Sequence, residues 1–262
     1  MKFKYGDIRT VLASHRVFFG GQHLDKPLPF YTDHLIINVP EHISLEPYCT
    51  FWGRSGTHLV SMGAFSYSSS ALPAIVSVGR YCSIAPGLQT LGDRHPHEWI
   101  STCPSLYSPH SGLIKMLEAD TGRENAFHSF DKRHKKITIG NDVWIGQNVT
   151  LAQGISVGDG AVIAANSLVI KDVPPYSVVG GNPAKVIKDR FNDSIVDAMR
   201  SLKWWNYSLQ DFSDLNVKDP YIFCHQFAER VISGKVKEYT PSVMTIKDIK
   251  AAAELRVESL TK

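Results

Sequence analysis

The sequence predicts a mainly β protein, a parallel β-helix of hexapeptide repeats, from three observations. A six-residue pattern runs through the middle of the chain, charge is sparse where the pattern is clearest, and one long segment interrupts it. Residues 137–187 hold five charged side chains in 51 positions, whereas residues 188–262 hold 23 in 75. This unevenness indicates a regular apolar scaffold followed by a polar region of a different kind.

The repeat is clearest from Ile139 onward, where six consecutive units keep one register. A helix would repeat every 3.6 residues and a lone strand every two. Six residues at about 3.3 Å each instead give a straight edge of about 20 Å, after which the chain turns a corner. The aliphatic first positions should stack inside the coils, and the Gly or Ala that usually follows should permit the tight corner. The first positions are Ile139, Ile145, Leu151, Val157, Ile163 and Val169.

A weaker form of the pattern appears at residues 72–89 and 39–50. We therefore expect an N-terminal segment over residues 1–38, a β-helix domain over residues 39–187 and a C-terminal helical region over residues 188–262. Asp193 or Ser194 is suited to cap the first helix of that region, because both side chains can accept a backbone hydrogen bond. Two further helices are expected, over residues 221–232 and 245–259.

A long excursion loop, residues 91–136, interrupts the repeat and carries five of the eleven histidines. Long excursions from a regular scaffold are usually functional or disordered, and this one contains Trp and His-Pro, which do not favour disorder. We therefore expect it to carry the site. Its histidines are His95, His97, His110, His128 and His134.

Composition excludes several classes of protein. The 262 residues are 43% hydrophobic with a net charge of +3, which argues against a disordered chain and gives no sign of nucleic-acid binding. No apolar run of about 18 residues is present, so we expect no membrane span, and the first residues do not look like a signal peptide. Four cysteines without a CxxC pair suit a reducing cytoplasm.

The motifs HPHEWISTCPSLY, NDVWIG and GGNPAKVI, followed by LKWWNYS, resemble the left-handed β-helix acyltransferases, in particular their xenobiotic, CatB-like branch. The resemblance covers roughly residues 60–210. It implies a left-handed coil, a homotrimer with active sites between subunits, and acetyl-CoA as co-substrate. It also implies a catalytic histidine at the start of the excursion loop, which the spacing to Trp99 matches to His95, with His97 as the competitor.

Acyl transfer from a thioester needs a base for the attacking group, and a histidine can serve at neutral pH. Asp93 or Glu98 could orient the imidazole, and Trp99 is a candidate for contact with the acceptor. Pantetheine could bond to main-chain groups at small corners, and the CoA phosphates need cations. The resemblance places Lys171 and Lys185 on the coenzyme and Trp144 beside the thioester. The expected coenzyme-binding residues are Trp144, Gly146, Ala164, Ala165, Lys171, Lys185 and Lys188.

Other chemistries are less consistent with the sequence. Cys82 falls at an inward repeat position, and Cys103 is not required by the expected mechanism. A zinc enzyme of the γ-carbonic-anhydrase type would need three histidines on neighbouring corners, yet residues 137–187 contain none, so no metal is expected. A non-catalytic scaffold should lack the loop histidine and the terminal lysines.

The expected reaction is therefore direct transfer of an acetyl group to a hydroxyl. The acceptor favoured by the longer excursion and by the additional residues 211–262 is a bacterial cell-surface glycan or its sugar precursor. The alternatives are N-acylation of a nucleotide-linked amino sugar and O-acetylation of an antibiotic of the chloramphenicol or streptogramin type.

Overall fold

The computed structural model describes residues 1–20, 31–109, 112–130 and 135–261, with side chains described for all of these except 54 and 257–261. The chain forms two compact units. One combines Met1–Thr90 with Lys136–Lys262, and the other, here called the excursion unit, is Leu91–Lys135. Each unit is described by itself.

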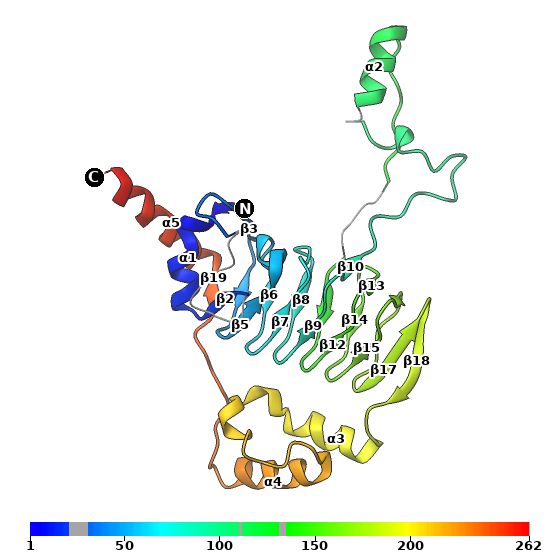
Figure 1. Ribbon diagram of the computed structural model, residues 1–262. Helices are drawn as coiled ribbons and strands as arrows, with labels where there is room; N and C mark the ends of the chain where they lie inside the picture. The colour runs from blue at the N-terminus through cyan, green and yellow to red at the C-terminus, as the bar shows by residue number, and fades with distance from the viewer. Residues whose placement is uncertain (21–30, 110–111, 131–134, 262) are drawn as a thin grey trace. The chain divides into compact units, whose positions relative to one another are not determined.

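The larger unit is a stack of coils whose strands form three sheets (Figure 1). Neighbouring strands are parallel, except for one antiparallel pair at an end of each of the two larger sheets. A six-stranded sheet contains β14 (Ser156–Val157), β11 (Ile137–Ile139), β8 (Val76–Val78), β6 (Ser61–Met62), β4 (Ser44–Leu45) and β19 (Met244–Thr245). An eight-stranded sheet contains β18 (Ala184–Asp189), β17 (Ser177–Gly181), β15 (Val162–Ile163), β12 (Trp144–Ile145), β9 (Ser83–Ile84), β7 (Tyr67–Ser68), β5 (Cys49–Phe51) and β2 (Val17–Phe19). The third contains β10 (Gln89–Thr90), β13 (Thr150–Leu151) and β16 (Leu168–Val169).

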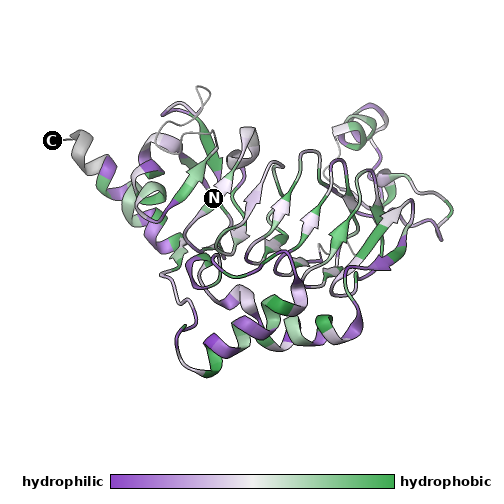
Figure 2. Cartoon of the chain, turned by 60° about the horizontal axis from the view of Figure 1, so that its bottom comes forward, coloured by the Kyte–Doolittle hydropathy of each residue, from purple (hydrophilic) through white to green (hydrophobic). Residues whose placement is uncertain are grey.

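Three hexapeptides make one coil. The chain passes through β11, β12 and β13 in turn and then repeats the circuit through β14, β15 and β16. Ile139 therefore pairs with Val157, Ile145 with Ile163, and Leu151 with Val169. All six first-position side chains lie in the core, as the repeat predicts. Figure 2 shows green, apolar stretches that recur along the coils, in agreement with a core that runs the length of the stack.

The small second position is required by the coil next to it. A Cβ added to Gly146 would lie 2.6 Å from the backbone nitrogen of Ala165, which cannot move aside as a side chain could. Close approach of successive coils, rather than backbone freedom alone, therefore explains the glycine at this corner.

The fourth position of many repeat units has a left-handed backbone. At the corner before the eight-stranded sheet it is occupied by Tyr48, Phe65, Tyr81 and Asp142, with φ between 53° and 63°. The three aromatic rings stack in sequence, with centroids 5.5 and 4.8 Å apart. Bulky residues rarely adopt this conformation, so packing must compensate for its cost. We call these four positions, with Gly160 and Tyr176 of the following coils, the corner ladder.

The stack begins earlier than the repeat shows. β2 pairs in parallel with β5, so residues before Val39 already belong to the eight-stranded sheet. β1 (Lys2–Lys4) and β3 (Ile36–Asn38) form a separate antiparallel pair, and α1 (Tyr5–Ser14) lies between them in the chain. A 3₁₀ turn, η1 (Gly53–Thr57), follows β5.

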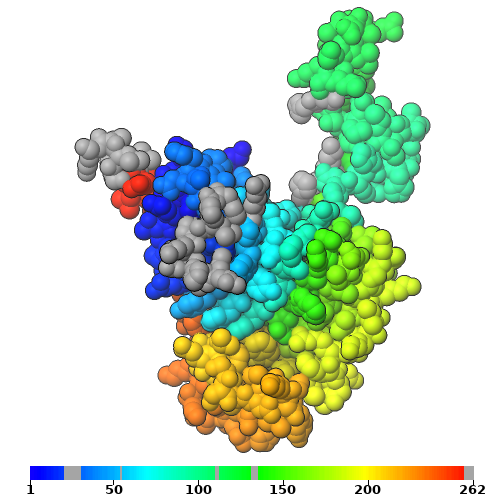
Figure 3. Space-filling model, in the orientation of Figure 1, coloured from blue at the N-terminus to red at the C-terminus, as the bar shows by residue number. Residues whose placement is uncertain are grey.

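The C-terminal region is helical, as expected, and it packs on the coils (Figure 3). Its elements are α3 (Asp193–Leu202), η3 (Trp204–Asn206), η4 (Leu209–Asp211), α4 (Pro220–Ile232) and α5 (Ile246–Thr261). The predicted cap of α3 is wrong. Asn192, not Asp193 or Ser194, is the N-cap, and its side chain accepts a hydrogen bond from the Ile195 N–H at 3.0 Å. In the part of the chain that the structure describes, no helix has the length and apolar character needed to span a bilayer.

The end of the chain returns to its beginning. β19 pairs antiparallel with β4, at the N-terminal edge of the six-stranded sheet, and α5 packs against α1. Met244 and Ile249 are fully buried there. The β4 edge of the six-stranded sheet is thereby covered by β19.

Candidate active site

The excursion unit is held together by an aromatic cluster. The Trp99 ring lies 6.0, 5.9 and 5.8 Å, edge to face, from Tyr107, His128 and Phe130. The backbone N–H of His128 donates to the carbonyl of Leu106, which links two segments of the unit that are 22 residues apart in the chain. A 3₁₀ turn, η2 (Pro104–Leu106), and α2 (Gly112–Thr121) complete it. This packing gives the loop a defined shape in which single side chains can be positioned.

His95 is fixed through one ring nitrogen. Its Nδ1 lies 2.8 Å from the carbonyl oxygen of Thr102 and 2.9 Å from the Tyr107 hydroxyl. Tyr107 is itself buried in the aromatic cluster, whereas the His95 side chain is exposed. The imidazole is thus held at one edge and open at the other.

The partner of Nδ1 determines the tautomer. A carbonyl oxygen can only accept, so a hydrogen bond to Thr102 requires the proton to be on Nδ1. In the neutral imidazole Nε2 then carries the lone pair and can act as a base. Neither partner was expected from the sequence. A contact to a backbone carbonyl cannot be predicted from the residue type, because every residue has one. The aromatic residues near Tyr107 in the sequence do indicate a packed cluster in this loop.

The other predicted residues of this unit make different contacts. Glu98 accepts from Arg94 at 3.1 Å and lies 3.5 Å from Nδ1 of His97, so its charge is directed to these side chains rather than to His95. Arg94 in turn lies over the Phe130 ring, 5.6 Å from its centroid. Asp93 is exposed, and Trp99 is part of the aromatic cluster. His110 and His134 lie outside the described residues.

The two cysteines noted in the sequence differ sharply. Cys82 is fully buried in the β-helix core, as predicted, and burial raises its pKa to about 12. Cys103 is exposed in the excursion unit, where hydrogen bonding with Ser105 lowers the pKa of its thiol.

Several of the predicted coenzyme-binding residues gather at one corner of the larger unit. Gly146 approaches Ala165, and the Ala164 N–H donates to the carbonyl of Val179 on the next coil. A Cβ on Gly180 would lie 3.0 Å from the Ala164 side chain, and Gly180 pairs with Lys185 across the β17–β18 hairpin. The small residues Gly146, Ala164 and Gly180 therefore form a column along the stack, and Lys185 lies at its end.

The remaining residues of this group are exposed. Lys171, Lys185 and Lys188 make no ion pair with any described residue, and Trp144 is 57% exposed on the outer face of β12. Three uncompensated cations near the end of the stack are suited to an anionic ligand.

Comparison with known proteins agrees with this architecture. The model of the bacterial transferase hexapeptide (six repeats) family matches residues 136–171. A probable macrolide acetyltransferase from Lysinibacillus sphaericus is 40% identical over 142 residues, which are 52% of this chain and 72% of that protein. The chain belongs to the hexapeptide-repeat acetyltransferases.

Two further relatives are named for different acceptors. A chloramphenicol acetyltransferase from Klebsiella aerogenes is 39% identical over 136 residues, covering 51% of this chain and 60% of that enzyme. A galactoside O-acetyltransferase from Escherichia coli (strain K12) is 51% identical over 53 residues, covering 20% of this chain and 26% of that enzyme. The chain thus spans about three fifths of the chloramphenicol acetyltransferase it matches.

In this member of the family the described residues contain no group of three or more His, Cys, Asp or Glu side chains that could hold a metal ion. At His95 the side chain in contact with Nδ1 is the neutral Tyr107 hydroxyl, and an imidazole held in this way can exchange a proton at its other nitrogen.

Proposed function

We propose that this protein is an acetyl-CoA-dependent O-acetyltransferase in which His95 is the general base. The observation that carries the proposal is the contact between Nδ1 of His95 and the Thr102 carbonyl, which leaves Nε2 as the basic nitrogen. Membership of the hexapeptide-repeat acetyltransferases supports the reaction class.

The reaction follows from that arrangement. The acceptor hydroxyl loses its proton to Nε2 as its oxygen attacks the thioester carbonyl of acetyl-CoA, and a tetrahedral oxyanion forms. When this collapses, the carbon–sulfur bond breaks and CoA leaves as a thiolate, which the imidazolium protonates. The Thr102 carbonyl stabilises the imidazolium through Nδ1–H during the interval between the two proton transfers. The products are the acetyl ester and free CoA, and no covalent enzyme intermediate is needed.

The coenzyme would lie along the column of small residues at Gly146 and Ala164, where a backbone unshielded by large side chains can bond to pantetheine. Its phosphates would be neutralised by Lys171, Lys185 and Lys188. Trp144 would contribute an exposed apolar surface near the thioester.

Two acceptor classes are supported by different observations. The similarity to chloramphenicol and macrolide acetyltransferases, over half of this chain, favours a hydroxyl of an antibiotic. The shorter but more identical match to a galactoside O-acetyltransferase favours a saccharide hydroxyl, such as that of a cell-surface glycan or its precursor. Both would use the same base and the same thioester.

We also propose that the chain assembles as a left-handed homotrimer whose active sites are completed by a neighbouring copy. Exposed apolar side chains on β12 and β18, namely Trp144, Val186 and Ile187, support a buried interface on this side of the coil stack. Light scattering on the purified protein should give three times the chain mass, and a monomer would contradict the assembly.

The decisive test of the base compares His95→Ala with His97→Ala. Loss of a general base costs typically 10²–10⁴-fold, so kcat for His95→Ala should fall by at least about 100-fold, with CoA binding retained. His97→Ala, which removes an exposed side chain only two residues away, should stay within about threefold of the parent protein. The acceptors are screened first with chloramphenicol, a streptogramin, a galactoside, bacterial glycans and an amino-sugar nucleotide. Retained activity in His95→Ala would overturn the assignment.

A further inference from the structure

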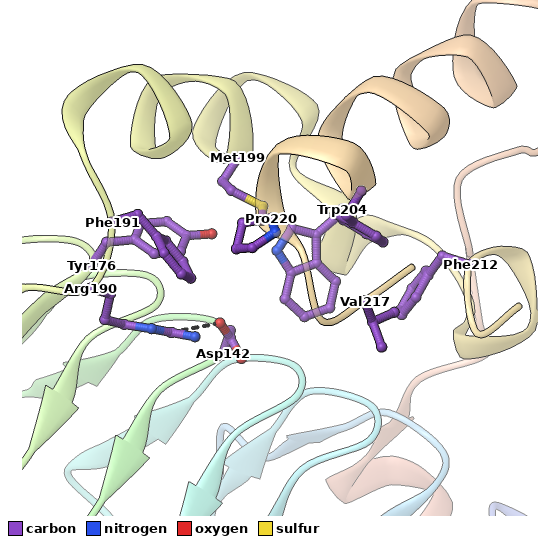
Figure 4. A pocket seen from close by; sticks show the side chains of 10 residues that line it. Asp142, Tyr176, Arg190, Phe191, Met199, Trp204, Phe212, Val217 and Pro220 are labelled. Atoms are coloured by element: carbon purple, nitrogen blue, oxygen red, sulfur yellow. Dashed lines mark hydrogen bonds and ion pairs between the residues drawn. The ribbon is translucent and has the colours of Figure 1, made fainter. Parts of the chain in front are cut away.

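The larger unit contains a hollow between the coils and the C-terminal helices (Figure 4). The cavity measures about 190 Å³ and none of its lining belongs to the excursion unit that carries His95. Its floor is formed by Asp142, Tyr176 and Arg190, and its roof by residues of the helical region. Those roof residues are Phe191, Met199, Trp204, Phe212, Val217, Pro220 and Phe223.

The hollow exists because the corner ladder is interrupted. Tyr48, Phe65 and Tyr81 fill successive positions with rings, but the next two positions are Asp142 and Gly160. Gly160 has no side chain, and a Cβ there would lie 2.5 Å from the Tyr176 ring. The helical region spans the interruption without filling it, since Trp204 packs on Tyr81 and Phe191 packs on Tyr176.

One polar atom of the cavity lacks an acceptor. Tyr176 is 1% exposed, and in the described part of the chain no group accepts a hydrogen bond from its hydroxyl. Burial raises the pKa of this phenol, and the Trp204 indole partly offsets the rise. Because the indole N–H is a donor, it leaves the Tyr176 O–H proton without an acceptor. A buried hydroxyl in this state destabilises the folded protein unless a bound group accepts from it.

The charges of the floor cancel. Nη1 of Arg190 donates to Oδ2 of Asp142 at 2.9 Å and to the carbonyl of Gly160 at 2.6 Å. A charged ligand would therefore meet an ion pair that is already neutral, and would lose its own hydration without gaining a counter-charge. The cavity suits an uncharged molecule.

We propose that this cavity is a binding site for a small neutral aromatic molecule carrying one hydrogen-bond acceptor, of the aryl ketone or aryl amide class. Five aromatic side chains line it, which suits a flat ring. A cavity of about 150 Å³ holds one benzene ring, so this volume accommodates a single ring with a small substituent. The acceptor of the ligand would take the proton of the Tyr176 hydroxyl.

The test uses three probes of similar size on the full-length protein: acetophenone, toluene and benzoate. Acetophenone has the acceptor, toluene lacks it, and benzoate carries a charge. Titration followed by NMR should show saturable binding of acetophenone, about five- to tenfold tighter than toluene, which is the value of one hydrogen bond, and tighter than benzoate. Absence of saturable acetophenone binding, with the cavity occupied by water only, would overturn the proposal.

Tyr176→Phe provides the matched variant, because it removes the hydroxyl and keeps the ring. It should bind toluene as before and lose the preference for acetophenone. Its melting temperature should not fall, since the deleted hydroxyl has no acceptor, and this separates loss of binding from loss of folding. Tyr221→Phe, on the exposed side of α4, is the control and should leave all three affinities unchanged. If Tyr176→Phe keeps the acetophenone preference, the hydroxyl is not the recognition group.

Discussion

At the scale of single residues, Arg80 and Glu46 form the ion pair that connects the early coils. Nε and Nη2 of Arg80 donate to the two carboxylate oxygens of Glu46 at 2.6 and 2.7 Å, and the Ala64 N–H donates to the same carboxylate at 2.8 Å. Arg80 also lies over the Tyr239 ring, 5.6 Å from its centroid. One guanidinium therefore joins two coils to the returning C-terminal segment.

This pair predicts how stability depends on pH. Burial by itself raises the pKa of Glu46, but hydrogen bonds from Arg80 and Ala64 outweigh it, so the pKa is lowered in the folded protein. A lowered carboxylate pKa contributes stability that is fully present above the unfolded pKa of about 4.3 and is lost as the pH falls through the folded pKa. Glu46→Gln should therefore cost about 2 kcal/mol at pH 7, and less at pH 3.5.

Urea unfolding at fixed protein concentration measures this difference. Asp33→Asn is the matched control, because its ion pair with Arg9 is half exposed and should contribute below about 1 kcal/mol. A Glu46→Gln deficit of equal size at both pH values would contradict the linkage.

At the same scale, the sequence points to candidate site residues more readily than to the groups that these residues contact. His95 is singled out by its place in a motif, and in the folded excursion unit its Nδ1 lies 2.8 Å from the Thr102 carbonyl oxygen. Its contact with Thr102 is to a backbone carbonyl and depends only on how the loop folds. Glu98 has the right chemistry to orient an imidazole but pairs with Arg94, because a carboxylate four residues from a guanidinium is within easy reach of it.

At the scale of elements, the hexapeptide period predicts the coils and the buried first positions. It does not reveal the left-handed fourth position, since Gly, Asn, Asp and aromatic residues all occupy it. The stack also starts at β2, where no repeat is visible, because pairing with β5 requires only extended backbone and not the repeat. The hexapeptide pattern therefore predicts the regular central coils better than it predicts the ends of the stack.

The corner glycines give a prediction at this scale. Gly146→Ala should destabilise the protein by about 2 kcal/mol or more, because the new methyl would lie 2.6 Å from the Ala165 nitrogen and 3.0 Å from the Ile163 carbonyl oxygen. Gly112→Ala is the control: nothing lies within 4 Å of the added Cβ, and alanine favours the helix. Thermal unfolding of both variants tests this, and equal melting temperatures would show that the coils can separate to admit a methyl group.

At the scale of the whole molecule, the two ends of the chain form one structure. α1, α5, β4 and β19 make a cap whose buried side chains come from both termini, including Ile8, Leu12, Met244 and Ile249. The cap covers the edge at which another strand could pair.

Truncation tests the role of this cap. A chain ending at Thr240 lacks β19 and α5, so it should expose the β4 edge and the apolar face of α1, and form large soluble aggregates during size-exclusion chromatography with light scattering. A chain ending at Arg256 keeps β19 and most of α5 and should elute like the full-length protein. The same elution and melting temperature for both truncations would show that the cap is dispensable.

The pairing of β19 with β4 also determines how late in translation the β4 edge can be covered. Ser44 and Leu45 leave the ribosome about 200 residues before Met244 and Thr245, which at 5–20 residues per second is roughly 10–40 s. During that interval the coils can stack one upon another as they emerge, but the first edge stays open until the last segment has been translated. A nascent chain stalled before residue 240 should therefore be more dependent on chaperones than the finished protein, although nearly all of its coils are already made.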